Sequence, residues 1–359
     1  MNETISVLIV DDSALVRKAL TNLLDGDPDI QVLAAAPDPL FAERYLRKRW
    51  PDVIVLDLEM PRMDGMTFLR KIMRERPTPV VVCSSLTQNG TQTSLHALAA
   101  GAVGTFAKPT SGIRNFFASD GHDLVDLVKA SAGANLEPLA RSHSTPHQED
   151  VSRPDRPPVE HGAAGPGVGR VVLIGASTGG IQAIETVLRA LPATAPPIAI
   201  VQHMPPQFTS ALAARLDHVC AVSVKEAEPG DWLQPGQALI APGGKHLALA
   251  QSGARYTVDI TDTEPVNRHK PSVDVLFRSA ARLGGGPGFL ALLLTGMGTD
   301  GAKGLLSLKL TRARTIVQDE KSCVVFGMPR EAVRLKAAGR ILPLSGMSRA
   351  ILAFASARS

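Results

Sequence analysis

Short apolar runs alternate with amphipathic segments through the first third of the chain. Runs rich in β-branched residues predict strands, here at 7–10, 32–35, 53–56, 80–83 and 103–106. Between them, apolar residues recur with the period of a helix, at 13–24, 40–49, 65–75, 91–99 and 120–131. This alternation predicts an α/β domain over residues 1–131 with a doubly wound, five-stranded parallel sheet.

The apolar periodicity stops after this domain. Residues 132–169 are rich in Pro, Ser, His, Arg and Gly, which predicts a flexible linker. His143, His147 and His161 lie in this segment with irregular spacing and no cysteine nearby. We therefore interpret these histidines as solvated linker residues and not as metal ligands.

A second α/β domain is predicted over residues 170–359. Strands are expected at 171–175, 198–202 and 289–295, and helices at 180–190, 209–216, 272–282 and 301–310. Residues 219–260 are rich in β-formers and turn residues, which predicts antiparallel hairpins added to a doubly wound, mainly parallel sheet. A chain of 359 residues is long enough for two such domains.

Composition narrows the setting of the protein. The formal charge is only +4 and the basic residues are dispersed, so we expect no nucleic-acid partner. No apolar run reaches the length of a membrane span, and the first residues lack the pattern of a signal peptide. Three widely spaced cysteines form no pair motif. We therefore expect a cytoplasmic protein without direct membrane insertion.

Charged and polar residues follow the strands of the first predicted sheet. Asp11 and Asp12 follow the first strand, Asp57 the third, Ser84 the fourth and Lys108 the fifth. The carboxyl ends of parallel strands meet at one edge, so these side chains should gather there. Three carboxylates favour Mg²⁺, and Asp57 is then placed to attack phosphorus and become an aspartyl phosphate. Taken singly, each residue would also fit a helix cap, a strand-end cap or a solvated lysine.

These residues, with LDLEMPRMDG, CSSLT and KP, resemble the receiver domain of two-component response regulators over roughly residues 5–130. The resemblance implies phosphorylation of Asp57 by a histidine kinase and a switch through Ser84 and Lys108. It also implies Mg²⁺ held by Asp11, Asp12, Asp57 and the backbone carbonyl of Glu59.

One position departs from the receiver pattern. Receivers usually carry an aromatic switch residue three positions before the lysine, where this chain has Thr105, followed by Phe106. Either the output coupling differs in detail or the fifth strand carries a register change.

The second domain opens on VVLIGASTGG, in which Gly175, Ser177 and Gly179 have G-x-S-x-G spacing. Three interpretations compete: an elbow that exposes a nucleophilic serine, a dinucleotide-binding loop, or a tight strand–helix junction. A dinucleotide site needs an acidic residue near the end of the second strand. This strand ends in Gln202 and His203, which disfavours the nucleotide.

A histidine at a neighbouring strand end favours a hydrolase. His203 would take the proton of Ser177, and Asp300, which follows the strand FLALLLT, would orient His203. Several alternatives stay open. Asp300 would also fit a cap of the helix at 301–310, and other candidate bases and orienting acids are His246, His269, Asp231, Asp274 and Asp319.

Blocks over residues 170–355 resemble the catalytic domain of the chemotaxis protein-glutamate methylesterase family. They read GASTGG, QHMPP, APGGKH, NRHKPSVDVLF, LLTGMGTDG and QDEKSCVVFGMPREA, in this order. The resemblance implies that Ser177, His203 and Asp300 are catalytic, with no cofactor for ester hydrolysis. It implies glutamate methyl esters on the cytoplasmic helices of chemoreceptors as substrate, and deamidation of receptor glutamines.

The tandem order suggests that phosphorylation of the receiver controls the enzyme, with the unphosphorylated receiver covering the cleft. A non-catalytic phospho-switch that binds a partner through the second domain is the competing hypothesis. A DNA-binding regulator is disfavoured, because the second domain shows no basic recognition helix.

Overall fold

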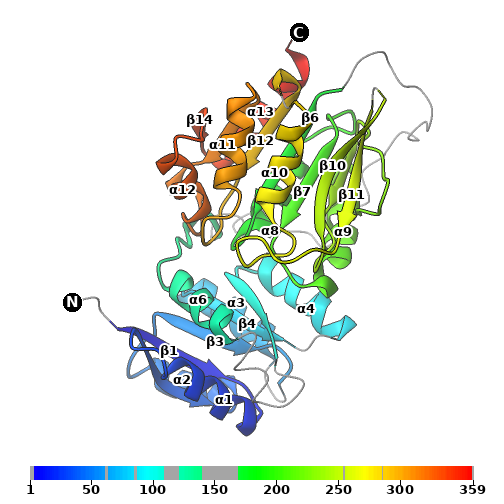
Figure 1. The fold of residues 1–359 in the computed structure, drawn as a ribbon. Helices are drawn as coiled ribbons and strands as arrows, with labels where there is room; N and C mark the ends of the chain where they lie inside the picture. Colours follow the sequence, from blue (N-terminus) through cyan, green and yellow to red (C-terminus); the bar gives the residue numbers. More distant parts are fainter. Residues whose placement is uncertain are drawn as a thin grey trace. The chain divides into compact units, whose positions relative to one another are not determined.

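A computed structural model describes residues 4–60, 64–84, 87–108, 121–139, 169–253, 255–284 and 286–357. The chain divides into two compact units between Pro146 and His147 (Figure 1). Most of the predicted linker, including His143, His147 and His161, falls in 140–168 and lies outside the described residues. The exact bounds of the domains and of the linker stay predictions.

The N-terminal unit contains the predicted five-stranded sheet, in the order β2-β1-β3-β4-β5 with every pair parallel. The strands are β1 (Ile5–Val10), β2 (Ile30–Ala36), β3 (Val53–Asp57), β4 (Val80–Ser84) and β5 (Gly104–Ala107). The helices are α1 (Ala14–Leu24), α2 (Pro39–Leu46), α3 (Gly65–Glu75), α4 (Gln88–Ala99) and α6 (Gly121–Ala132). The doubly wound parallel fold is confirmed, and its order reverses between β1 and β3.

The first helices begin where a capping side chain stands. Ser13, Asp38, Asp64 and Thr87 each accept a hydrogen bond from the backbone N–H three residues ahead, which satisfies a donor that the first helical turn leaves free. Three of these caps directly follow the segments that carry the predicted phosphoacceptor residues. Capping therefore fixes where the loops at this edge of the sheet end.

The C-terminal unit is built on a seven-stranded sheet in the order β14-β13-β12-β6-β7-β9-β8, with every pair parallel. Its strands are β6 (Val171–Ala176), β7 (Ile198–Gln202), β8 (Ser223–Glu226), β9 (Gln237–Ile240), β12 (Phe289–Leu293), β13 (Arg314–Gln318) and β14 (Arg340–Leu342). The main helices are α8 (Gly180–Arg189), α9 (Pro206–Val219), α10 (Val273–Arg282), α11 (Ala302–Leu310), α12 (Met328–Arg334) and α13 (Leu344–Ser356). Helices α10, α11 and α12 cover one face, and α8, α9 and α13 cover the other (Figure 1).

The added antiparallel hairpin is confirmed, although fewer segments of 219–260 pair in antiparallel fashion than the sequence predicts. Strands β10 (His246–Ser252) and β11 (Arg255–Thr261) form a hairpin as a separate two-stranded sheet. Strands β8 and β9 instead join the main sheet in parallel. Their connection passes beside β11, where Trp232 bridges Thr257. The turn-rich stretch at 227–236 is therefore a crossover and not a tight hairpin turn.

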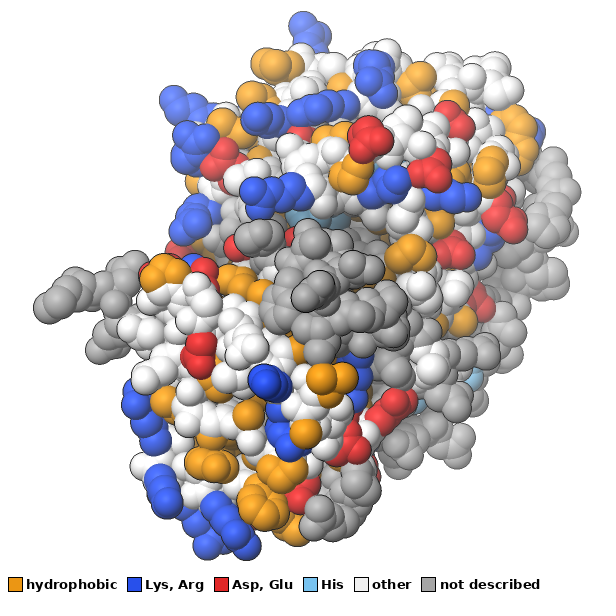
Figure 2. All heavy atoms as spheres, turned by 60° about the horizontal axis from the view of Figure 1, so that its bottom comes forward, with side chains coloured by type: hydrophobic (Ala, Val, Ile, Leu, Met, Phe, Trp, Pro, Cys, Tyr) orange, Lys and Arg blue, Asp and Glu red, His pale blue; other side chains and the backbone are white. Residues whose placement is uncertain are grey.

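The charge distribution on the surface and the length and polarity of the helices concern two kinds of partner, nucleic acid and membrane. On the face drawn in Figure 2, lysine and arginine side chains are scattered among acidic, polar and apolar ones. Within the described ranges, no helix combines the length and the apolar character that crossing a membrane would require.

Candidate active site and phosphoacceptor site

The three residues predicted as a triad follow three neighbouring strands at the centre of the seven-stranded sheet. Ser177 follows β6, His203 follows β7, and Asp300 lies beyond β12, on the other side of β6. The strand order reverses here, because the chain runs from β6 to β7 on one side and later returns to β12. The carboxyl ends of strands at such a reversal form a crevice that commonly binds ligands.

The backbone of Ser177 is held from both neighbouring strands. Its N–H donates to the carbonyl of Thr295 at 3.0 Å, and its carbonyl accepts a hydrogen bond from Nε2 of Gln202 at 2.9 Å. His203 is tied to the same turn, since its N–H donates to the carbonyl of Ala176 at 3.1 Å. These bonds bring the backbones of Ser177 and His203 side by side.

The turn after Ser177 requires glycine. Gly179 has φ of 75°, a left-handed conformation, and a Cβ there would lie 2.5 Å from Val324. Helix α8 begins at the next residue. A sharp strand–turn–helix elbow of this form presents the serine at the carboxyl edge of the sheet. The elbow interpretation thus fits the observed backbone.

His203 and Asp300 form a hydrogen-bonded pair. Nε2 of His203 lies 2.9 Å from Oδ2 of Asp300, and the two side chains are 8% and 0% exposed. A carboxylate only accepts hydrogen bonds, so the proton of a neutral His203 belongs on Nε2. Nδ1 of His203 is buried and has no hydrogen-bond partner among the described residues. This nitrogen is therefore the free acceptor of the pair.

Asp300 is surrounded by donors. It accepts hydrogen bonds from the N–H of Val273 at 2.6 Å, from Nδ2 of Asn267 at 2.7 Å and from Oγ of Ser272 at 2.8 Å. Burial alone would raise the pKa of Asp300, but the bonds from His203, Asn267 and Ser272 outweigh it and hold that pKa below its usual range. Asp300 is therefore ionised near pH 7.

Asp300 caps a different helix from the one that the sequence suggests. Helix α11 follows Gly301 without a side-chain cap, so Asp300 does not cap the helix at 301–310. It accepts instead from the first N–H of α10, whose own Ser272 makes no side-chain cap bond. The positive end of α10 thus adds to the stabilisation of the Asp300 carboxylate.

The rival histidines have other surroundings. His246 is fully buried, with Nδ1 accepting from the N–H of Ser272 at 3.2 Å and Nε2 bonded to the carbonyl of Glu264 at 3.1 Å. His269 stacks on His203, with ring centroids 3.9 Å apart and planes 17° apart. Burial, with smaller effects of His203 and Arg268, lowers the pKa of His269 to about 4. His246 has no nitrogen left to act as base, and His269 stays neutral near pH 7.

The rival acids are used elsewhere. Asp231 pairs with Lys225, Asp274 with Arg278, and Asp319 caps the short helix η2 (Glu320–Ser322). Among the described residues, none of these three carboxylates is bonded to a histidine. Of the candidate acids, only Asp300 meets His203.

The predicted phosphoacceptor residues gather at the carboxyl edge of the N-terminal sheet. One carboxylate oxygen from each of Asp11, Asp12 and Asp57 lies within 4.8 Å of the others. Nζ of Lys108 lies 2.6 Å from Oδ2 of Asp57 and 3.5 Å from Oδ2 of Asp11. Burial raises the pKa of Asp57 to about 6, against the opposing effects of Lys108 and the N–H of Glu59.

The predicted switch residues adjoin this cluster. The N–H of Lys108 donates to the carbonyl of Ser84 at 2.8 Å, and the hydroxyl of Ser84 donates to the carbonyl of Gly90 at 3.1 Å. Strand β5 pairs with β4 without irregularity. Phe106 packs in the core while Thr105 is half-buried. The register change considered for this strand is therefore wrong, and Phe106 does not replace the missing aromatic residue.

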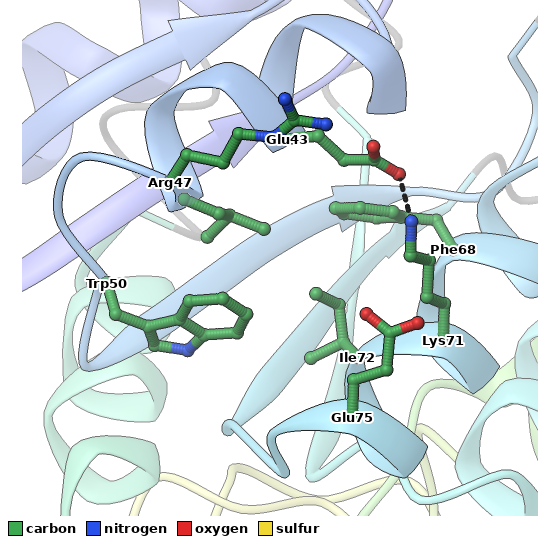
Figure 3. A pocket seen from close by; sticks show the side chains of 8 residues that line it. Glu43, Arg47, Trp50, Phe68, Lys71, Ile72 and Glu75 are labelled. Carbon is green, nitrogen blue, oxygen red and sulfur yellow. Dashed lines mark hydrogen bonds and ion pairs between the residues drawn. The ribbon is translucent and has the colours of Figure 1, made fainter.

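A separate pocket of about 220 Å³ lies in the N-terminal unit, between α2 and α3 (Figure 3). Phe68 and Ile72 line it together with Trp50, and an ion pair of 2.5 Å joins two other lining residues, Lys71 and Glu43. None of the predicted site residues lines this pocket.

Comparisons with known proteins identify a family for each unit of the chain. A family model described as CheB methylesterase matches residues 172–351, and one described as response regulator receiver domain matches residues 7–115. A protein-glutamate methylesterase/protein-glutamine glutaminase 2 of Pseudomonas syringae pv. tomato is 53% identical over 352 residues, covering 97% of this chain and 98% of the relative. A protein-glutamate methylesterase/protein-glutamine glutaminase 1 of Xanthomonas oryzae pv. oryzae is 53% identical over 348 residues, covering 96% and 99%.

A solved structure resembles the C-terminal unit. The CheB methylesterase catalytic domain of Thermotoga maritima is 38% identical and has a TM-score of 0.50, covering 51% of this chain and 97% of that chain. The chain therefore belongs to the CheB methylesterase family and carries a response regulator receiver domain ahead of the methylesterase domain.

Proposed function

We propose that this protein is a phosphorylation-controlled hydrolase that removes methyl groups from glutamate methyl esters on chemoreceptor helices. The observation that carries the proposal is the buried His203–Asp300 pair of 2.9 Å, next to the Ser177 elbow at the strand-order reversal. Family membership and the activity for which the relatives are named support the same reaction.

The arrangement supports nucleophilic catalysis. Ser177 Oγ attacks the ester carbonyl and passes its proton to Nδ1 of His203, the nitrogen not engaged by Asp300. Asp300 keeps the imidazole in the required tautomer and stabilises the imidazolium that forms. The proton then moves from Nδ1 to the leaving methoxide, methanol departs, and an acyl-enzyme remains. Water activated by His203 releases the glutamate carboxylate and restores Ser177.

Two loops adjoin Ser177, and their backbone N–H groups are the candidate donors to a developing oxyanion. The Ser177–Gly180 turn and the Gly296–Gly298 loop touch, because a Cβ on Gly296 would lie 2.7 Å from Cβ of Ser177. We assign the oxyanion to backbone N–H groups of these loops. Removing one such donor typically lowers turnover about 100- to 1,000-fold. The same attack on the side-chain amide of a glutamine releases ammonia, so the site also supports deamidation of receptor glutamines.

The receiver site fits a divalent cation. The atoms that would bind the metal are hard carboxylate oxygens. Oδ2 of Asp11 and Oδ2 of Asp57 are buried, and among the described residues they contact only the Lys108 ammonium. Asp11, Asp12, Asp57 and the carbonyl of Glu59 would hold Mg²⁺, which suits such ligands and neutralises phosphoryl charge. Asp57 would attack the phosphoryl group carried by a histidine kinase, and Lys108 would pair with the phosphoryl oxygens.

Phosphorylation would control the esterase through the receiver. A phosphoryl group adds about −1.5 to −2 charges at Asp57, and Ser84 and Lys108 would reorient toward it. We infer that the unphosphorylated receiver limits access of the receptor helix to Ser177. Couplings of this kind typically change activity about 5- to 150-fold.

Methanol release from methylated chemoreceptors tests the proposal. We expect release by the wild-type protein, a rise on adding a small-molecule phosphodonor with Mg²⁺, and no rise for Asp57→Asn. Binding of receptors without methanol release would instead support the non-catalytic phospho-switch. Ammonia release from receptor glutamines tests the second reaction in the same preparation.

A further inference from the structure

A tight turn at residues 266–269 lies against the His203–Asp300 pair. Val266 and His269 exchange two backbone hydrogen bonds of 3.1 and 3.0 Å. The two central residues, Asn267 and Arg268, have φ of 54° and 67°. Positive φ at both central positions defines a type I′ turn, which strongly prefers Asn and Gly. The turn therefore fixes the directions of its first central residue and of the residue that closes it.

Asn267 reaches the carboxylate of the pair. Its Nδ2 donates to Oδ1 of Asp300 at 2.7 Å and to Oδ2 of Asp274 at 3.0 Å. Both carboxyl side chains are buried. One amide thus separates two buried acids and satisfies an oxygen of each, while Oδ2 of Asp300 remains directed at His203. An aspartate in this position would bring a third acid into the same space.

His269 covers the imidazole of the pair. Its ring lies nearly parallel to that of His203 with centroids 3.9 Å apart. The ring of His269 makes no hydrogen bond within the described residues, so its contribution is the stacked face itself. Burial keeps His269 neutral near pH 7, with a pKa of about 4. A neutral ring stacks on the imidazolium that forms during catalysis without repelling it.

We infer that the 266–269 turn is a positioning clamp for the triad: Asn267 fixes the Asp300 carboxylate, and the His269 ring fixes the plane of His203. Asn267 and His269 are positioning residues, because they act through the pair and not on the substrate. The clamp holds Nε2 of His203 toward Asp300 and leaves Nδ1 for Ser177. This inference rests on the proposed esterase activity and adds to it the residues that orient its base.

Three variants of the full-length, phosphodonor-treated protein test the clamp. His269→Ala removes the stacked face, and His269→Phe keeps a planar ring without nitrogens. Asn267→Gly removes the amide but keeps a residue that readily adopts positive φ. The exposed histidine of helix α9 provides the control variant, His218→Ala. Methanol release from methylated chemoreceptors gives kcat and KM, and thermal unfolding gives the stability of each variant.

We expect a split between turnover and binding. His269→Ala and Asn267→Gly should lower kcat by about 10- to 100-fold and change KM by less than about threefold, because small misplacements of catalytic groups cost this much. His269→Phe should stay within about threefold of wild type, as should His218→Ala. A loss in His269→Phe as large as in His269→Ala would overturn the stacking role, and wild-type kcat in both His269→Ala and Asn267→Gly would overturn the clamp.

A spectroscopic signature separates positioning from general stability. The proton on Nε2 of His203, held by Asp300, should give a low-field ¹H resonance in the wild-type protein. We expect this resonance to be lost or broadened in His269→Ala and Asn267→Gly and retained in His269→Phe, all recorded at a temperature at which thermal unfolding shows each variant to be folded. An unchanged resonance in all three variants would contradict the clamp. If the wild-type protein released no methanol, the proposed function would fail, and the resonance would still decide the clamp.

Discussion

The side-chain amide of Gln202 donates a hydrogen bond of 2.9 Å to the backbone carbonyl of Ser177. The same Nε2 donates to the carbonyl of His203 at 3.1 Å. One buried side chain thus joins the backbones of the predicted nucleophile and the predicted base. A substrate site built from loops on separate strands gains rigidity from such a cross-link.

Replacing Gln202 should therefore affect stability and turnover together. Gln202→Leu has similar volume but leaves the carbonyls of Ser177 and His203 without this donor. We expect a loss of about 1–3 kcal/mol in the free energy of unfolding and a fall in kcat of about 10-fold or more. Denaturant unfolding and methanol release measure the two effects. Gln251→Leu, at an exposed position of β10, is the matched control, and equal effects of the two substitutions would contradict the cross-link.

Removing the nucleophile should abolish activity without unfolding the protein. Ser177 is only half-buried, and Ala fits the backbone of the elbow. Methanol release by Ser177→Ala should fall to background, while its melting temperature stays close to that of wild type. The protein should still be phosphorylated at Asp57. Substantial methanol release from this variant would disprove the assignment of Ser177.

Asp57 makes the stability of the metal-free receiver depend on pH. Burial raises its pKa from 3.8 to about 6, so between these values the folded state binds more protons than the unfolded state. Stability should therefore fall as pH rises from about 4 through 6. Asp57→Asn removes the buried charge and should stabilise the receiver by about 1–3 kcal/mol at pH 7.5, with little gain at pH 4.

Chemical denaturation in the presence of a chelator measures this difference. Asp52, whose carboxylate accepts hydrogen bonds from Ser6, allows a comparison through Asp52→Asn, which should destabilise the protein. A larger stabilisation by Asp57→Asn at pH 4 than at pH 7.5 would reverse the expected sign and contradict the assigned pKa.

Chelation should also abolish phosphorylation. The three carboxylates of Asp11, Asp12 and Asp57 lie within 4.8 Å of one another, and Lys108 offsets only part of their charge. We expect phosphotransfer from a small-molecule phosphodonor to require Mg²⁺, and Asp12→Ala to raise the Mg²⁺ concentration needed for half-maximal phosphorylation. Phosphate incorporation at several Mg²⁺ concentrations measures this. Unchanged incorporation in excess chelator would contradict the metal site.

Strand-end chemistry explains why much of both sites is predictable from sequence. In parallel sheets, residues that directly follow strands meet at one edge, so Asp57 and Lys108, or Ser177 and His203, can be paired from the strand pattern alone. The turn at 266–269 is different. Non-glycine residues with positive φ cost about 1–3 kcal/mol each, and the sequence VNRH carries no glycine to mark the turn. His269 is therefore a rival base in the sequence and a stacking partner in the structure.

Some strands of the C-terminal sheet are also not predicted from the sequence, because their residues give too weak or too ambiguous a pattern. β14 is a three-residue strand at the edge of the sheet with exposed Ile341, which gives little apolar pattern. β13 is buried along most of its length, but its apolar run is only two residues long, Ile316 and Val317, and is too short to indicate a strand. β8 and β9 have turn residues between them, and a parallel crossover and a hairpin use the same residue types. Their pairing depends on β11 and β7, which local sequence does not specify.

The control of the esterase by the receiver leads to the last prediction. A fragment beginning at Gly169 retains the seven-stranded sheet and the hairpin, with Ser177, His203 and Asp300, and lacks the receiver. If the unphosphorylated receiver limits access to Ser177, this fragment should release methanol faster than the unphosphorylated full-length protein, by about 5- to 150-fold. It should not respond to a phosphodonor. The same fragment with Ser177→Ala provides the background. A fragment no more active than the unphosphorylated whole would show that phosphorylation acts by activation and not by relief of inhibition.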